Sequence, residues 1–120
     1  MKLKQIGKYS ELPIVGLKIN KISGMIAIVF DDEEGSFLDI HSTFKVTLHN
    51  QTNDISPRDK NALVFLYDHF DEQIREARAD KRGNLWLKFD NGTEITIEDG
   101  PYENWHYTKR NLKTNDHLYV

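Results

Sequence analysis

The apolar residues in the first half of the chain recur with the two-residue period of β-strands. Residues 14–20 alternate between apolar and polar side chains, and residues 25–30 form a nearly continuous apolar run. Between residues 38 and 49 the even positions are apolar except for Ser42. The pattern predicts three strands in a meander, the last one long and bent near Ser42. The expected strands are residues 14–20, 25–30 and 38–49, joined by a turn at 21–24 and a polar connection at 31–35.

The middle of the chain changes to a helical period. Its apolar residues stand three or four positions apart, at Leu63, Leu66, Tyr67 and Phe70. Upstream, Ser56 suits an N-cap, Pro57 suits the first helical position, and Asp59 follows the cap by three residues. We therefore expect a helix from about residue 57 to residue 71.

The last third returns to strands. Residues 73–80 fit either an extension of the helix or a strand, and the short polar turn that follows favours a strand. The next hairpin can be derived from register. A three-residue loop at 90–92 sets Leu87 opposite Ile95 and keeps the apolar side chains on one face, whereas a two-residue loop sets Leu87 opposite Thr96. The longer loop, a type I turn with a bulge at Gly92, is therefore expected.

This register also pairs Phe89 with Thr93 and Leu85 with Ile97, and it places Lys88 opposite Glu94 on the outer face. The complete pattern is βββ–α–βββ. It predicts a single α+β domain over residues 1–120, with a largely antiparallel sheet built from two three-stranded meanders. A chain of this size buries about two-thirds of its surface on folding, which is enough for one core.

Composition narrows the class of protein. The chain has no cysteine, which excludes disulfides and thiolate metal sites and suits a reducing cytosol. No apolar run has the length of a membrane span, and the N-terminal segment lacks the apolar stretch of a secretory signal. The formal net charge of −3 argues against direct binding of nucleic acid. We expect a cytoplasmic protein.

The sequence contains few signs of catalytic chemistry. The glycines do not follow the spacing of phosphate-binding or dinucleotide-binding loops. No two histidines have the four-residue spacing of a helical zinc site, and His41 and His49 are separated by roughly 26 Å on an extended strand. We therefore expect no cofactor, no metal and no catalytic residue. The alternative is a small enzyme or ligand-binding domain that uses His106 with Glu103 or Asp99 as an acid–base pair.

Aromatic residues have two interpretations. Tyr102, Trp105 and Tyr107 can cover the open end of the sheet or anchor an interface, and for Trp105 we favour the cover. Trp86 is different, because the predicted register places it with Lys88 on the face opposite the core. An exposed tryptophan among charged residues is a candidate for partner binding.

Acidic residues form two clusters. The first follows the predicted hairpin and contains Glu94, Glu98, Asp99 and Glu103; the second is the polar connection Asp31, Asp32, Glu33 and Glu34. Either cluster can be a solvated rim or turn, or a negative surface that attracts a basic partner. With Trp86, they are the predicted partner-binding residues.

The C-terminal pattern "GNLWLKFDNGTEITIEDGPYENWHY", preceded by "IREARAD", resembles small bacterial immunity proteins of polymorphic toxin and contact-dependent growth inhibition systems. The residues that carry the resemblance are Gly83, Leu85, Leu87, Phe89 and Gly92, followed by Tyr102, Glu103 and Trp105. The resemblance implies a cytosolic, non-enzymatic protein that binds and neutralises one cognate toxin domain, often a nuclease. The acidic clusters fit such a partner, because a nuclease site that holds phosphates is basic and an acidic surface can cover it. A structural subunit is a further alternative.

Overall fold

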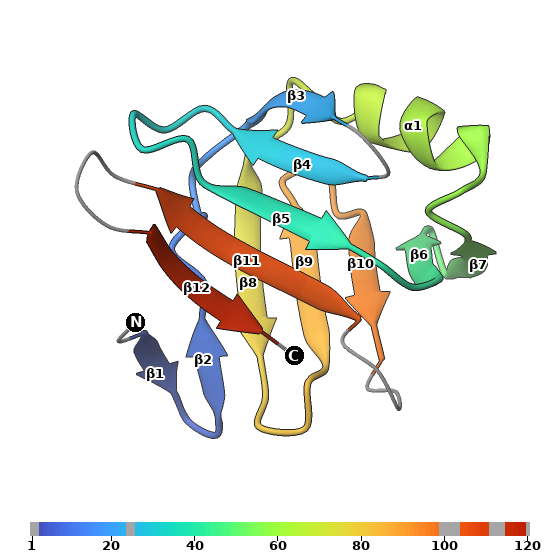
Figure 1. Ribbon diagram of the computed structural model, residues 1–120. Helices are drawn as coiled ribbons and strands as arrows, with labels where there is room; N and C mark the ends of the chain where they lie inside the picture. The colour runs from blue at the N-terminus through green and yellow to red at the C-terminus, as the bar shows by residue number, and fades with distance from the viewer. Residues whose placement is uncertain (1–2, 24–25, 99–103, 111–114, 120) are drawn as a thin grey trace.

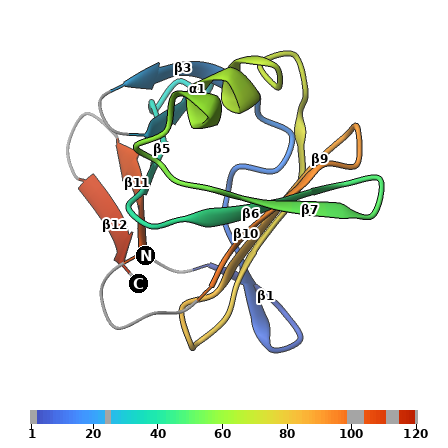
Figure 2. The same cartoon turned by 90° about the vertical axis from the view of Figure 1, so that its right-hand side faces the viewer.

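Two antiparallel β-sheets and one helix make up the described part of the chain. The computed structural model describes residues 3–23, 26–98, 104–110 and 115–119 (Figure 1). The sheets lie face to face with their strands crossing, and α1 (Lys60–Tyr67) covers one end of the space between them (Figure 2). The predicted α+β domain with mostly antiparallel strands and one helix is therefore confirmed, although its arrangement is not that of two meanders.

The larger sheet has seven strands, which come from both halves of the chain. Their order is β1 (Lys4–Ile6), β2 (Tyr9–Glu11), β8 (Ile74–Ala79), β9 (Leu85–Phe89), β10 (Glu94–Ile97), β6 (Phe44–Leu48) and β7 (Gln51–Ile55). The smaller sheet has the order β12 (Asn115–Tyr119), β11 (Trp105–Arg110), β5 (Phe37–Ile40), β4 (Ala27–Phe30) and β3 (Ile19–Ser23).

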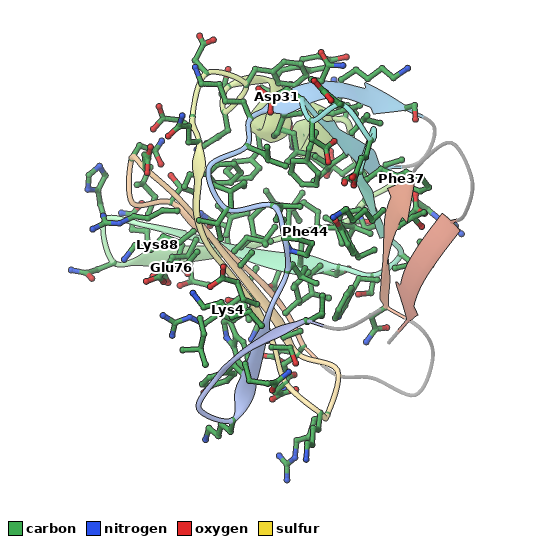
Figure 3. The ribbon with its side chains drawn as sticks, turned by 90° about the vertical axis from the view of Figure 1, so that its left-hand side faces the viewer. Lys4, Asp31, Phe37, Phe44, Glu76 and Lys88 are labelled. Atoms are coloured by element: carbon green, nitrogen blue, oxygen red, sulfur yellow. The ribbon has the colours of Figure 1, made fainter. Side chains whose placement is uncertain are left out.

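The core lies between the inner faces of the two sheets. Strand residues alternate between buried and partly exposed positions, as in β9, where Leu85, Leu87 and Phe89 are buried. Figure 3 shows Phe44 between the sheets, with Glu76 and Lys88 on the outer side of the seven-stranded sheet. The largest fully buried side chains include Trp105, Tyr107, Phe30, Phe44 and Phe89.

The β9–β10 hairpin has the predicted register. Leu87 pairs with Ile95, Lys88 with Glu94, and the Phe89 nitrogen donates to the Thr93 oxygen at 2.9 Å. Gly92 has the expected positive φ of 92°. The strand interpretation of residues 73–80 is confirmed as well, since β8 occupies most of that segment.

The predicted long strand at 38–49 is wrong. It is interrupted at residues 41–43, so that β5 joins the five-stranded sheet and β6 joins the seven-stranded sheet. Leu38 and Ile40 of β5 and Phe44 and Val46 of β6 are buried in the shared core, whereas Leu48 at the end of β6 is exposed. The period therefore continues across the break, which explains why it resembled one strand.

Other boundaries also differ from the predictions. Residues 21–23 belong to β3 rather than to a turn, and residues 12–18 form an irregular segment that buries Leu12 and Ile14. Strands β1, β2, β7, β11 and β12 were not predicted. Several have few buried side chains or are very short, so their hydrophobic period is weak.

The helix is shorter than predicted. Its N-cap is Asp59, whose carboxylate accepts from the Asn61 nitrogen at 2.9 Å, and not Ser56. The Ser56 hydroxyl instead accepts from the Arg58 nitrogen at 3.3 Å in the preceding turn. The helix ends at Tyr67, and the following residues form turns in which the His69 side chain is buried.

Candidate functional site

The first acidic cluster faces lysines. Glu94 lies 3.7 Å from Lys88, and Glu98 lies 2.9 Å from Lys45, whose pKa is raised by its hydrogen bond and ion pair with Glu98. Asp99 and Glu103 lie outside the described residues, as does Tyr102. The two described carboxylates of this cluster are therefore each opposed by a positive charge on a neighbouring strand.

The second acidic cluster forms the connection between β4 and β5, and two of its members stabilise that turn. Asp31 accepts from the Lys18 nitrogen at 2.9 Å. Asp32 accepts from both the backbone nitrogen and the hydroxyl of Ser36. These bonds fix the loop, so its other carboxylates are held at one end of β4 and β5 in the five-stranded sheet.

Glu33 is exposed, and Glu34 lies 3.3 Å from Lys109 on β11. The neighbouring outer surface of the five-stranded sheet is hollowed by a shallow depression of about 640 Å³. The described residues of its lining include carboxylates, one lysine and an apolar floor: Asp32, Glu33, Glu34 and Asp39, Lys21, and Ala27, Val29 and Phe37. We call this surface the acidic depression.

A buried hydrogen-bond chain connects the acidic depression with the core. The Tyr107 hydroxyl lies 3.3 Å from Ser36 Oγ and donates to it, while the Ser36 hydroxyl donates to Asp32. Burial raises the pKa of Tyr107, and the charges of Asp32 and Glu34 act in the same direction, while the bond to Ser36 offsets part of the effect. The tyrosine therefore stays protonated and keeps donating at neutral pH.

The His106 side chain contacts Asp39 and Thr108, which are not the partners that the sequence suggested. Its Nδ1 lies 3.6 Å from the carboxylate of Asp39, which is its cross-strand neighbour, and its Nε2 lies 2.9 Å from Thr108 Oγ1. The expected partners Asp99 and Glu103 lie outside the described residues. Within the described part of the chain, no group of three or more His, Asp or Glu side chains could hold a metal ion.

His69 has a structural role that its sequence context did not reveal. The Phe65 carbonyl lies 2.8 Å from Nδ1 and can only accept, so Nδ1 carries the proton. Nε2 lies 3.1 Å from the hydroxyl of Thr93, and the ring packs between Phe65 and Phe89. This histidine therefore links the end of the helix with the β9–β10 loop.

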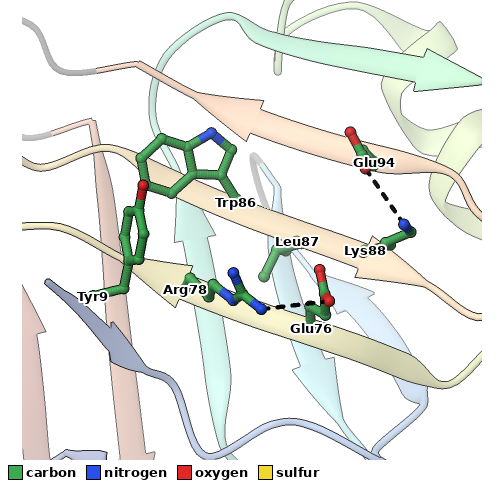
Figure 4. Close-up of a pocket in the computed structure, with 7 residues that line it drawn as sticks. All are labelled: Tyr9, Glu76, Arg78, Trp86, Leu87, Lys88 and Glu94. Atoms are coloured by element: carbon green, nitrogen blue, oxygen red, sulfur yellow. Dashed lines mark hydrogen bonds and ion pairs between the residues drawn. The ribbon is translucent and has the colours of Figure 1, made fainter. Parts of the chain in front are cut away.

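The outer face of the seven-stranded sheet carries a pair of aromatic residues. Trp86 lies on this face as predicted, and Tyr9 on β2 contacts it edge-on, with ring centroids 5.3 Å apart and an angle of 87° between the planes. Figure 4 shows the indole of Trp86 face-on, with the Tyr9 ring at its edge. Tyr9 is the partner that sequence reasoning missed, because the very short strand β2 gives almost no periodic signal.

Trp86 and Tyr9 line two depressions. The first has a volume of about 240 Å³ and also contacts Glu76, Arg78, Lys88 and Glu94 (Figure 4). The second has a volume of about 590 Å³ and is also lined by Gln5, Gly7, Lys8, Asp80, Lys81, Arg82 and Asn84. We call the first the ring pocket and the second the basic depression.

The turn between β8 and β9 positions the cations of the basic depression. Asp80 accepts from the Arg82 nitrogen at 3.0 Å and from the backbone nitrogen and side-chain amide of Asn84, each at 2.9 Å. Burial by itself would raise the pKa of Asp80, but these hydrogen bonds outweigh it and the pKa is lowered. The ionised carboxylate therefore fixes a turn that carries Lys81 and Arg82.

The structure thus defines a small two-sheet α+β domain with depressions on both outer faces. The chain belongs to DUF6188, a family of unknown function, whose pattern it matches over residues 10–114. No curated protein and no solved structure shows significant similarity to the chain. None of the helices in the described residues is long and apolar enough to cross a membrane.

Proposed function

We propose that the protein is a non-catalytic binding protein that docks a basic protein partner in the acidic depression. The observation that carries the proposal is the composition of this surface. Four carboxylates and one lysine are among the described residues that line it, around an apolar floor. A carboxylate rim attracts a positively charged partner, and apolar floor residues such as Val29 and Phe37 supply the area from which docking excludes water.

The alternative acidic surface is less suited to this role. Glu98 is bonded to Lys45 at 2.9 Å, and Glu94 lies 3.7 Å from Lys88. Each lysine cancels much of the field of its carboxylate beyond the immediate contact. In the acidic depression Lys109 likewise opposes Glu34 at 3.3 Å. However, Asp32 bonds neutral groups of Ser36 and Glu33 is exposed, so carboxylates still outnumber cations among the described lining residues. The proposal therefore places docking at the Asp31–Glu34 connection rather than at Glu94 and Glu98.

The partner that we propose is a bacterial toxin domain, which the resemblance to immunity proteins implies. A nuclease active site is basic because it holds phosphates, and an acidic surface can cover its mouth without any chemical step. Inhibition would then be stoichiometric. The protein would act in the cytoplasm of the cell that it protects, which also suits a chain without cysteine.

The test begins with the neighbouring genes: a toxin domain found at the C-terminus of a large protein that one of them encodes is co-expressed with this protein, followed by growth rescue, co-purification and association kinetics. Glu33→Lys changes an exposed member of the rim. We expect it to slow association several-fold at low salt and much less at high salt, because rim charges act through screened attraction. Glu94→Lys is the matched control, with the same charge change on an exposed residue of the other sheet.

Two results would contradict the proposal. Failure of the wild-type protein to bind or protect against the toxin domain would remove the immunity function. Normal association of Glu33→Lys, together with slow association of Glu94→Lys, would move docking to the seven-stranded sheet.

A further inference from the structure

The two depressions around Trp86 differ in charge although they share an aromatic wall. In the ring pocket, the described lining contains two carboxylates, Glu76 and Glu94, and two cations, Arg78 and Lys88. In the basic depression, the charged residues of the described lining are Lys8, Lys81 and Arg82 with a single carboxylate, Asp80. A charge-balanced pocket therefore adjoins a cationic one across Tyr9 and Trp86.

The ring pocket suits a flat, neutral, polar ring. The broad face of the indole provides a stacking surface, with Tyr9 at its edge (Figure 4). The two ion pairs on its other side are loose, at 3.5 Å for Arg78 and Glu76 and 3.7 Å for Lys88 and Glu94. Such pairs retain donors and acceptors for the edge of a ligand ring.

The basic depression suits an anionic group bound to that ring. Lys81 and Arg82 are exposed on a turn that Asp80 fixes, and Lys8 lies over the Tyr9 ring at 5.6 Å. The Asp80 carboxylate accepts hydrogen bonds from its own turn. These bonds reduce its electrostatic repulsion of an incoming anion. Cations beside a stacking aromatic residue form the usual binding surface for single-stranded nucleic acid.

We propose that this face binds a nucleotide unit, with the base stacked on Trp86 in the ring pocket and the phosphate against Lys8, Lys81 and Arg82. The net charge of −3 does not oppose this assignment, because carboxylates gather at the opposite sheet, in the acidic depression. The site is separate from the surface assigned to the protein partner. A free nucleotide and a single-stranded oligonucleotide present the same chemistry.

The experiment measures binding of fluorescein-labelled single-stranded oligonucleotides, oligo(dT) and oligo(rU), to the complete protein by fluorescence anisotropy at about 50 and 200 mM salt. Unlabelled mononucleotides compete in a second arm. Competition by mononucleotides at comparable concentration assigns the site to a free nucleotide, and binding of oligonucleotides alone assigns it to a strand. The wild-type protein is expected to bind, with affinity that falls as salt rises.

Trp86→Ala is expected to weaken binding about 10- to 100-fold through loss of stacking, and Trp86→Phe to weaken it less. Arg82→Glu, at an exposed turn position that leaves the core intact, is expected to weaken binding and to reduce its salt dependence. Lys60→Glu makes the same kind of charge reversal on α1, which lies far from β2 (Figure 1), and should leave binding unchanged.

Three results would overturn the assignment. One is the absence of binding by either class of nucleotide at low salt. Another is binding that Trp86→Ala and Arg82→Glu leave unchanged, which would place the ligand elsewhere. The third is binding of neutral oligosaccharides but not of nucleotides, which would make the ring pocket a sugar subsite.

Discussion

Trp105 shows how one residue can belong to the core although its sequence neighbourhood is polar. It was expected to cover the sheet from a loop, and the structure confirms its burial but places it on strand β11. Its indole nitrogen donates to the Gly83 oxygen at 2.9 Å, which joins the five-stranded sheet to the β8–β9 turn of the other sheet. The indole is therefore a direct connection between the two layers.

Trp105→Ala should lower the free energy of unfolding by about 3–5 kcal/mol, because it leaves a large cavity and an unpaired carbonyl. Urea denaturation provides the measurement. Trp86→Ala, on the outer face of the other sheet, is the matched control and should cost much less. A change under about 1 kcal/mol for Trp105→Ala would contradict its role in the core.

Tyr107 should make stability depend on alkaline pH. Its pKa is raised, above all by burial, so the folded protein holds the phenol proton more tightly than the unfolded chain does. The stability that results is fully present below the unfolded pKa of about 10 and is lost as pH rises through the folded pKa.

Tyr107→Phe removes the ionisable hydroxyl. Unfolding by urea at about pH 8 and pH 10.5 should show a smaller alkaline loss for this variant than for the wild type. Tyr67→Phe is the control, because Tyr67 is 56% exposed. An identical alkaline loss in Tyr107→Phe and wild type would contradict the assignment.

At the scale of elements, the β9–β10 hairpin is determined by its own residues. Gly92 has a φ of 92°, and apart from the glycine and its two chain neighbours no heavy atom lies within 4 Å of the position that a Cβ would take. The glycine is therefore required for its backbone conformation and not for space. Asn91 adds a local bond, since its side chain accepts from the Thr93 nitrogen at 2.9 Å.

Gly92→Val should destabilise the protein by about 1–3 kcal/mol, since a β-branched residue is strained at positive φ. Gly92→Asn should restore part of the loss, because asparagine tolerates the left-handed region. Thermal and urea unfolding of the two variants provide the comparison. Equal stability of the two variants would show that backbone conformation is not the cause.

On the scale of the whole molecule, the two outer faces carry different chemistry. The five-stranded sheet presents the acidic depression, and the seven-stranded sheet presents Trp86 beside the basic depression. The layers separate these surfaces (Figure 2). The two proposed ligands therefore need not compete.

This separation predicts independent effects of mutation. Glu33→Lys should weaken binding of the basic protein partner and leave oligonucleotide binding unchanged, whereas Arg82→Glu should have the reverse effects. Anisotropy and association kinetics on both variants measure this directly. Loss of both activities in each folded variant would indicate one shared site and would contradict the separation.

The sequence by itself determined the local features. The turn that follows β8 favoured a strand there, although the period of residues 73–80 fitted a helix as well. Side-chain period and turn chemistry, which act within a few residues, predicted the β9–β10 register, the left-handed Gly92 and the outward position of Trp86. A helix was evident for the same reason, although the structure moves its start from Pro57 to Lys60, after the Asp59 cap.

Only the tertiary structure decided which strands meet. The apolar period of residues 38–49 is equally compatible with one long strand and with two strands in different sheets that face a shared core. The structure has two strands, with β5 in the five-stranded sheet and β6 in the seven-stranded sheet. The candidate sites depend on the same long-range pairing. Lys45 contacts Glu98 and Tyr9 contacts Trp86 because strands that are distant in the sequence pair in one sheet. Outside the hairpins, no local pattern encodes which strand lies beside which.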